Sequence, residues 1–479
     1  MASETRRPRL IRAAQSCADE LGLTSFYHTP PDVKILCLLR LTRMFGYGAL
    51  TLVLATFLRE LQVSRTAIGF FMTLTLAGDV MISFVLALFA DSIGRRAVLC
   101  FGSSLMIVSG VTFALSENYW VLLIGAILGI LSPNGGETGP FRAIEESTVA
   151  HLTNTRRRSD IYAWYNVSGT IGSAFGMIIC GWVTQYLHAV LGWPLVESYR
   201  VMFYGYASIG ALKILLVSRL SRAVEWDTEG REVTSPLLSS NGTETTPLLR
   251  ENVSRTSANS SSTGPGNGLA LPSISRESIK VMSVLCLLFA LDAFATGLSP
   301  LTWVTFFFRT RYGLDEGTLG SLFFTTRTMA AVSMILASSL AKRLGNVKTM
   351  VFTHLPSAVF LALIPIPDDV HLSVVFLVLR SCLQSMSIAP RSAFIAAMVL
   401  PEERTAVMGM VNVVRTTSQS LGPLVTGFLA DHDLFWTSFV CAGSLRASYD
   451  IGLLVLFKNR EHDRSKGETE EDGNEEPRP

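Results

Sequence analysis

The stretch RSDIYAWYNVSGTIGSAFGMIICG, residues 158–181, decides the fold because the chain contains it twice. Moved forward by 246 positions, it lies on RTAVMGMVNVVRTTSQSLGPLVTG, residues 404–427, and six positions are identical. A second alignment, moved by 251 positions, matches residues 46–94 with residues 297–345 at three glycines and one phenylalanine. The sequence therefore predicts one six-span unit made twice, an arrangement known from membrane proteins with a site between two halves.

Composition places this repeat in a membrane. The 479 residues are 49% hydrophobic and only 16% charged, with a mean hydropathy of +0.39, whereas soluble domains carry about 25% charged residues. Seven cysteines are dispersed without a CxxC pattern, which argues against a disulfide framework or a zinc site. The basic residues are spread among loops and the net charge is +2, so we expect no nucleic-acid partner and no cofactor.

Twelve apolar spans approach the roughly 20 residues that a helix needs to cross a bilayer. They lie near 35–59, 66–90, 96–115, 119–140, 160–186, 199–219, 279–308, 317–341, 347–366, 371–396, 404–430 and 435–457. The fold class expected is an all-α membrane protein with twelve transmembrane helices in two pseudo-symmetric six-helix bundles. The expected parts are a cytoplasmic segment 1–34, a bundle 35–220, a disordered linker 221–278, a bundle 279–457 and a disordered tail 458–479.

Lysine and arginine indicate the orientation. The short loops on one side and the span ends beside them hold eleven basic residues, and those on the other side hold five. By the positive-inside rule the richer side, which also carries both termini, is cytoplasmic. No apolar run precedes Val33, so no cleavable signal peptide is visible, and the first span is expected to direct insertion.

One loop carries a family resemblance. Between the second and third spans the chain reads ALFADSIGRRAVL, residues 87–99. This loop resembles the signature G-x-x-x-D-R-x-G-R-R of the major facilitator superfamily, and the twelve spans, the central break and the repeat resemble that family too. Ala87 and Ser92 depart from the pattern, and the counterpart loop has Lys342 in place of the acid. The resemblance implies a secondary transporter in which two bundles rock about a central site.

The same resemblance assigns roles to Asp91, Gly94, Arg95 and Arg96 as a cytoplasmic latch. Gly94 allows a tight turn between antiparallel helices, and Asp91 is an anion that can face the positive N-terminus of another helix. By resemblance that partner is the eleventh span, which begins near residues 403–405. The alternative is that the two arginines only determine topology.

The branch resembled is the fungal-type, drug:proton antiporter-like one, although two of its signatures are poor. Residues 121–131 of the fourth span contain no arginine, and the Gly-Pro pair expected in the fifth span stands instead at Gly422-Pro423. Proton-coupled efflux is still favoured over uptake. The stretch SPNGGETGPFRAIEES, residues 132–147, also looks like a less characterised prokaryotic and fungal branch.

Polar side chains at membrane depth are the candidate substrate and proton pathway, because a charge at mid-bilayer costs at least about 2.5–3.5 kcal/mol. The candidates are Arg43, Asp79, Asn134, Glu137, Asn166, Asp292, Arg327, Arg380, Asn412 and Arg415. They either form fixed pairs or include carboxylates that titrate while arginines hold an anionic group. Glu137 and Asp292 are the first candidates for proton coupling and Asp79 is the third. A lone His354 within a span is interpreted as structural.

The remaining motifs bear on the energy source, on catalysis and on the membrane in which the protein resides. There is no G-x-x-x-x-G-K-[ST] motif and no Ser/His/Asp grouping, so neither an ATP-driven pump nor an enzyme is expected. Glu244, Leu248 and Leu249 fit an acidic dileucine signal, which indicates sorting adaptors and a vacuolar or lysosome-like membrane, with the plasma membrane as the alternative. We expect a monomeric transporter that moves a small organic solute by alternating access, driven by protons. The alternative is a non-transporting membrane sensor or scaffold on the same fold.

Overall fold

The computed structural model describes residues 23–129, 131–133, 140–153, 158–225, 276–344, 346–387 and 404–473, and these are almost entirely helical. The first half contains α2 (Leu23–Tyr27), α3 (Pro31–Glu60), α4 (Arg65–Ile93), α5 (Arg95–Leu115), α6 (Tyr119–Leu128), α7 (Pro140–Leu152), α8 (Arg158–Gln185), the π-helix η1 (Tyr186–Val190), α9 (Leu195–Ser218) and the 3-10 turn η2 (Arg222–Val224). The second half contains α10 (Arg276–Leu298), α11 (Leu301–Tyr312), α12 (Glu316–Leu344), α13 (Asn346–Leu363), α14 (Val370–Met386), α16 (Arg404–Asp431) and α17 (Phe435–Gly473).

The helix boundaries reproduce the sequence repeat. Helices α8 and α16 both contain 28 residues and begin 246 positions apart, at Arg158 and Arg404. Helices α4 and α12 both contain 29 residues and begin 251 positions apart, at Arg65 and Glu316. These are the two shifts on which the sequence alignments rest, so the expected repeat is confirmed at the level of the helices.

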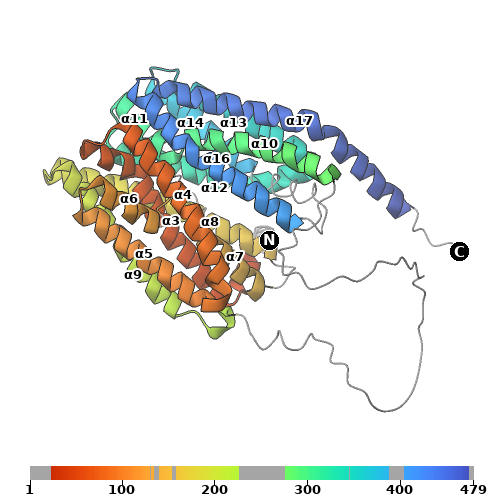
Figure 1. The fold of residues 1–479 in the computed structure, drawn as a ribbon, viewed down its shortest axis with the longest axis horizontal. Helices are drawn as coiled ribbons and strands as arrows, with labels where there is room; N and C mark the ends of the chain where they lie inside the picture. The colour runs from red at the N-terminus through yellow and green to blue at the C-terminus, as the bar shows by residue number, and fades with distance from the viewer. Residues whose placement is uncertain are drawn as a thin grey trace, which may run out of the picture.

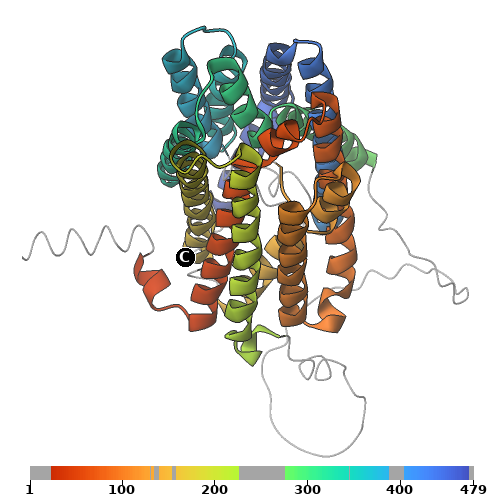
Figure 2. The same cartoon turned by 90° about the vertical axis from the view of Figure 1, so that its left-hand side faces the viewer.

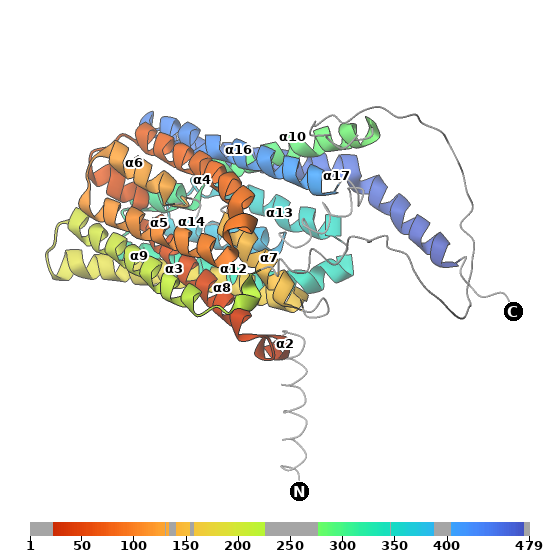
Figure 3. The same ribbon diagram turned by 60° about the horizontal axis from the view of Figure 1, so that its bottom comes forward.

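The two halves lie against each other along long helices (Figure 1). Helix α4 of the first half packs along α16 of the second, and α8 packs along α12, as Figure 3 shows for α4 and α16. We call the end of the bundle with the α3–α4 loop the Gln62 end, and the opposite end, with the α4–α5 turn, the Gly94 end.

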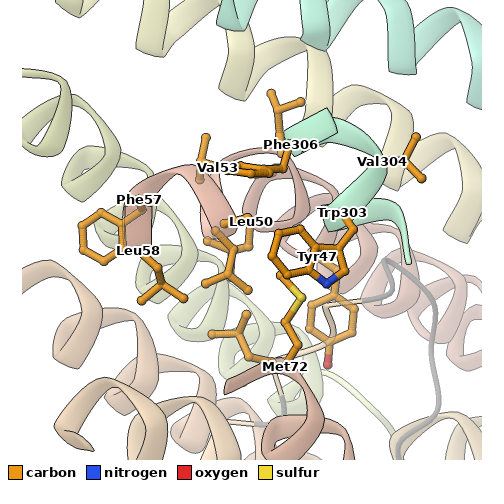
Figure 4. Packing of buried hydrophobic residues seen from close by; sticks show 14 of the residues in the cluster. Tyr47, Leu50, Val53, Phe57, Leu58, Met72, Trp303, Val304 and Phe306 are labelled. Atoms are coloured by element: carbon orange, nitrogen blue, oxygen red, sulfur yellow. The ribbon is translucent and has the colours of Figure 1, made fainter. Parts of the chain in front are cut away.

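Buried apolar side chains join the halves at one end only, within the described residues. The largest cluster lies toward the Gln62 end and draws on both halves, with Tyr47 and Leu50 of α3 packed near Trp303 and Phe306 of α11 (Figure 4). Toward the Gly94 end two smaller clusters occur, one within the first half around Leu36 and one within the second half. Figure 2 shows the ribbon from the left-hand side of Figure 1. The halves therefore share a core at the Gln62 end and keep separate cores at the other.

Length and hydropathy agree with membrane insertion. Among the described residues, six helical segments are long and apolar enough to cross a bilayer, and three shorter apolar helices accompany them. The apolar run 283–312 is divided by the Ser299-Pro300 turn into α10 and α11, because proline lacks the N–H that a continuous helix needs. The seventh expected span is thus two helical pieces.

Three expected boundaries differ from the structure. The fourth span was placed at 119–140, but α6 ends at Leu128 and a second helix, α7, begins at Pro140, where that span was expected to stop. The linker was expected from 221, but residues 221–225 pack on the first half, with Val224 fully buried. The tail was expected to be disordered from 458, whereas α17 continues as helix to Gly473, consistent with the helix propensity of Glu, Lys and Arg.

Candidate functional site

The first half contains a closed ion pair. Helix α3 contributes Arg43 and α7 contributes Glu145, and two guanidinium nitrogens of Arg43 donate to the two carboxylate oxygens at 2.6 and 2.7 Å. The side chains of Arg43 and Glu145 are 1% and 0% exposed. Tyr165 of α8 donates its hydroxyl to Glu145 Oε2 at 2.6 Å. The bidentate geometry and the third donor leave this carboxylate well satisfied, which is the arrangement of a fixed anchor between helices.

A second layer of charge surrounds this pair. The Arg40 guanidinium lies 4.0 Å from the centre of the Tyr165 ring, and its Nη1 lies 3.8 Å from Glu146 Oε1. Arg142, one turn before Glu146 on α7, donates from Nε to the same oxygen at 2.7 Å. The charges around Arg43 and Glu145 therefore occur as neighbouring partners of opposite sign.

The second half contains a histidine between two carboxylates, which we call the histidine cluster: His354, Asp292, Asp450 and Arg446. His354 on α13 places Nδ1 2.9 Å from Asp450 Oδ2 on α17 and Nε2 3.7 Å from Asp292 Oδ1 on α10. Arg446, one turn before Asp450, lies with Nε 4.0 Å from Asp292 Oδ1 and donates from Nη2 to Thr296 Oγ1 at 2.9 Å. All four side chains are at least 97% buried.

The net charge of the histidine cluster depends on whether the imidazole of His354 is neutral or protonated. With a neutral imidazole its charges are −1, −1 and +1, and with a protonated imidazole a further +1 brings the sum to zero. Histidine is the side chain whose unperturbed charge change falls between about pH 5 and 8, so it is the general choice for a group that carries a proton. The arrangement therefore places one ionisable imidazole between two carboxylates inside a helical bundle.

Two further arginines lie beside the histidine cluster. Arg380 on α14 is 93% buried, and its charge interacts unfavourably with those of Arg446 and Arg327. Arg327 lies on α12 and is half-buried. The second half thus contains three of the ten predicted pathway residues: Asp292 belongs to the histidine cluster, Arg380 interacts with its Arg446, and Arg327 interacts with Arg380.

The other predicted residues are scattered. Asp79 is buried on α4, within electrostatic range of Tyr206. Asn166 is half-buried on α8 and Asn412 is exposed on α16. Arg415 is half-buried and lies 5.7 Å from the centre of the Phe289 ring. Asn134 and Glu137, and the sorting residues Glu244, Leu248 and Leu249, fall outside the described residues.

The signature loop forms a tight turn closed by an unexpected carboxylate. Gly94 has φ +96°, which a residue with a side chain rarely adopts, and it separates α4 from α5. Glu225, at the start of the linker, accepts hydrogen bonds from the backbone N–H groups of Arg95 and Arg96 at 2.8 and 3.2 Å. Asp91 lies in the last turn of α4, and its side chain is outside the description.

At the Gln62 end each seam is capped by a side chain of the opposite half. Asp431, the last residue of α16, accepts from the backbone N–H groups of Arg65 and Thr66 on α4 at 3.0 and 2.7 Å. Gln185, its repeat counterpart at the end of α8, accepts from Gly317 of α12 at 2.9 Å. Partial burial raises the pKa of Asp431, but hydrogen bonds from Thr66 and Arg65 and the Arg65 charge outweigh it, so the pKa stays below 3.8.

Sequence reasoning missed Glu145, Arg446 and Asp450, and it assigned His354 a structural role. Glu145 was outside the fourth span because that span was ended at 140, before α7. Arg446 and Asp450 stand within the last expected span, four residues apart on one helix face, and met the criterion that selected Asp292. A lone histidine becomes informative only when two carboxylates from other helices are known to flank it.

Comparisons with known proteins agree with this architecture. A family model described as Major Facilitator Superfamily matches residues 36–379 and 285–479. An uncharacterized membrane protein of Saccharomyces cerevisiae is 35% identical over 433 residues, covering 89% of this chain and 94% of its own length. The quinolone resistance protein NorA of Staphylococcus aureus is 22% identical over 171 residues, or 36% of this chain and 40% of NorA. Among solved structures, the nucleoside transporter NupG aligns with a TM-score of 0.64 at 13% identity, over 90% of this chain and 100% of its own.

Proposed function

The chain belongs to the Major Facilitator Superfamily, and on that premise we propose that it moves a small organic solute across its membrane by alternating access in exchange for protons. It is an integral, multi-pass membrane protein of a transporter family and not an enzyme. The kind of solute, the coupling to protons and the direction of transport are what we propose. The observation that carries the proposal is the buried histidine cluster in the second half.

Alternating access is supported by the way the halves meet. Their shared apolar core lies toward the Gln62 end, and their separate cores lie toward the Gly94 end. With the Gly94 end in the cytoplasm, as the distribution of basic residues favours, this is a state closed to the outside. Rocking the halves about the solute would open the α4–α16 and α8–α12 seams and bring the Gly94 ends together.

Proton coupling is supported by the chemistry of His354. A proton on the imidazole brings the net charge of the histidine cluster to zero. If water reaches the cluster from a different side in each of the two conformations of the transport cycle, binding and release of this proton are coupled to the conformational change. Asp292 was a sequence candidate, and the structure adds His354 and Asp450 as its neighbours. We propose these three residues as the proton-binding group, positioned by Arg446.

The direction of transport and the membrane that holds the protein complete the proposal. The partial similarity to a drug-resistance protein supports exchange of solute for protons in the export direction. Cytoplasmic termini follow from the basic loops, and Glu244, Leu248 and Leu249 support a vacuolar or lysosome-like membrane over the plasma membrane.

The test uses the purified full-length protein in proteoliposomes, with a panel of organic solutes and an imposed pH gradient. We expect the gradient to stimulate transport by the native protein. We expect His354→Gln to reduce the stimulation by the pH gradient at least about 10-fold. The variant should keep solute counterflow, because counterflow needs no proton. Asp368→Asn, on an exposed loop of the same half, is the matched control and keeps both activities. Full gradient stimulation in His354→Gln would remove this residue from coupling, and absence of transport for every solute would favour the sensor.

A further inference from the structure

Arg380 and Arg327 lie in the second half without a negative partner among the described residues. Arg380 is 93% buried on α14, and its Nε has no hydrogen-bond acceptor there. Arg327 is half-buried on α12, which packs directly along α14. Neither guanidinium has a carboxylate within ion-pair distance in the described part of the chain. Two buried or partly buried cations therefore lie on adjacent helices, close enough for their charges to act against each other.

The surroundings make this arrangement unfavourable by itself. The charges of Arg446 and Arg327 both act against the charge of Arg380. Arg446 is already engaged with Asp292 and with Thr296. Arg380, Arg327, Arg446, Asp292 and Asp450 sum to +1 with a neutral His354 and to +2 with a protonated one. Burial of unbalanced positive charge costs free energy unless an anion compensates it.

Another buried arginine and a partly buried one show the contrast. Arg43 is held by both oxygens of Glu145, and Arg309, near the Gln62 end, is paired with Glu316. The fold therefore supplies acids where an arginine has a structural role. Arg380 and Arg327 are exceptions in the region where the proton-binding group lies.

Arg327 also offers a route of approach. A charged side chain that faced lipid at this depth would be expensive, so its exposed portion is expected to face the space between the helices of the two halves. Guanidinium groups bind oxyanions through planar pairs of N–H donors, and two of them can hold one carboxylate or phosphate from two sides.

We infer that Arg327 and Arg380 form a subsite for an oxyanion group, so that the transported solute is an organic anion. The inference rests on the proposed transport function and names its substrate class. The shared chemistry is a carboxylate or a phosphate ester, and a neutral compound of the same shape lacks the group that these arginines need.

The test measures binding and needs no proton gradient. Thermal unfolding of the full-length protein in detergent is followed with four matched probe pairs: lactate and lactamide, benzoate and benzamide, glycerol 3-phosphate and glycerol, and phenyl phosphate and phenol. We expect at least one anion to raise the Tm and its neutral partner to have no effect. The carboxylate and phosphate pairs distinguish the two sources of the oxyanion.

Variants separate a binding role from a structural one. Arg380→Gln should weaken anion binding at least about 10-fold and leave the Tm of the ligand-free protein unchanged or higher, because it removes an unbalanced buried charge. Arg380→Lys should retain part of the affinity, and Arg311→Gln, on the exposed end of α11, should retain all of it. Arg327→Gln repeats the test at a half-buried position if the first variant is not recovered.

The outcomes are separate from those of the coupling experiment. Equal stabilisation by neutral and anionic probes, no stabilisation by any probe, or undiminished anion binding in Arg380→Gln and Arg327→Gln would overturn the subsite. Anion binding that persists in His354→Gln supports it even if proton coupling fails.

Discussion

The two halves are alike where they touch each other and different where they hold charge. At the seams, a Cβ on Gly427 would lie 2.5 Å from the carbonyl oxygen of Arg65, and a Cβ on Gly181 would likewise clash with the backbone of α12. Gly427 and Gly181 are repeat counterparts. Both positions therefore require glycine, so the close approach of the helices follows the repeat.

The charged clusters do not follow it. In the first half Arg43 pairs with Glu145, which also accepts a hydrogen bond from Tyr165. The second half places His354 between two acids, and no described carboxylate pairs with Arg380. The difference teaches that the repeat specifies a docking geometry, and that each half uses its interior separately. On this view the first half is a rigid support and the second half carries the proton and the anion.

The largest expected effect tests the rigid support. Glu145→Gln removes the carboxylate that both guanidinium nitrogens of buried Arg43 contact, so we expect the free energy of unfolding to fall by about 3–5 kcal/mol. Thermal or denaturant unfolding in detergent measures this loss. Glu197→Gln is the control, because Glu197 pairs with Arg200 at a partly exposed surface and should cost less than about 1 kcal/mol.

A double change sharpens this first prediction. Replacing Arg43 and Glu145 together, by Met and Gln, removes both charges and should recover part of the stability lost in the single variant. A Glu145→Gln protein as stable as the native one would mean that the ion pair is not an anchor.

An intermediate effect is expected in the second half. Asp450→Asn keeps an acceptor near His354 and leaves Asp292 to balance Arg446, so the free energy of unfolding should fall by about 1–3 kcal/mol. Both variants are measured under the same conditions. A smaller loss of unfolding free energy in Asp450→Asn than in Glu145→Gln would distinguish the histidine cluster, which can change its charge, from the fixed ion pair of the first half. A loss equal to that of Glu145→Gln would make the two halves equivalent.

The same contrast explains what the sequence could and could not reveal. Helix boundaries at Arg158 and Arg404 follow from the repeat, because the length of an apolar span and the glycines that allow close packing are local features of the sequence. The histidine cluster joins α10, α13 and α17, and no spacing along the chain shows that His354 meets Asp450. Asp292 could be selected because a charge within a span is visible by itself. Glu225, which caps α5 from across the linker boundary, had no local signal at all.

The smallest effect concerns the seams, where the repeat is best preserved. Asp431→Gln gives α16 the residue that ends α8 at Gln185, so the hydrogen bonds to Arg65 and Thr66 can persist while the charge is lost. Because Asp431 is exposed, we expect a loss of only about 0.5–1 kcal/mol in unfolding free energy.

The pH dependence of this variant completes the prediction. The pKa of Asp431 is lowered below 3.8 in the folded protein, so its charge contributes stability above pH 3.8, and the contribution disappears as the pH falls further. Between pH 5 and 8 the carboxylate stays ionised, and the difference in unfolding free energy between Asp431→Gln and the native protein should be constant. Transport by the variant should then keep the native pH profile, since the proposed proton-binding group lies elsewhere. A changed profile would place a titrating group at the seam and would weaken the division between a docking surface shared by both halves and chemistry confined to one.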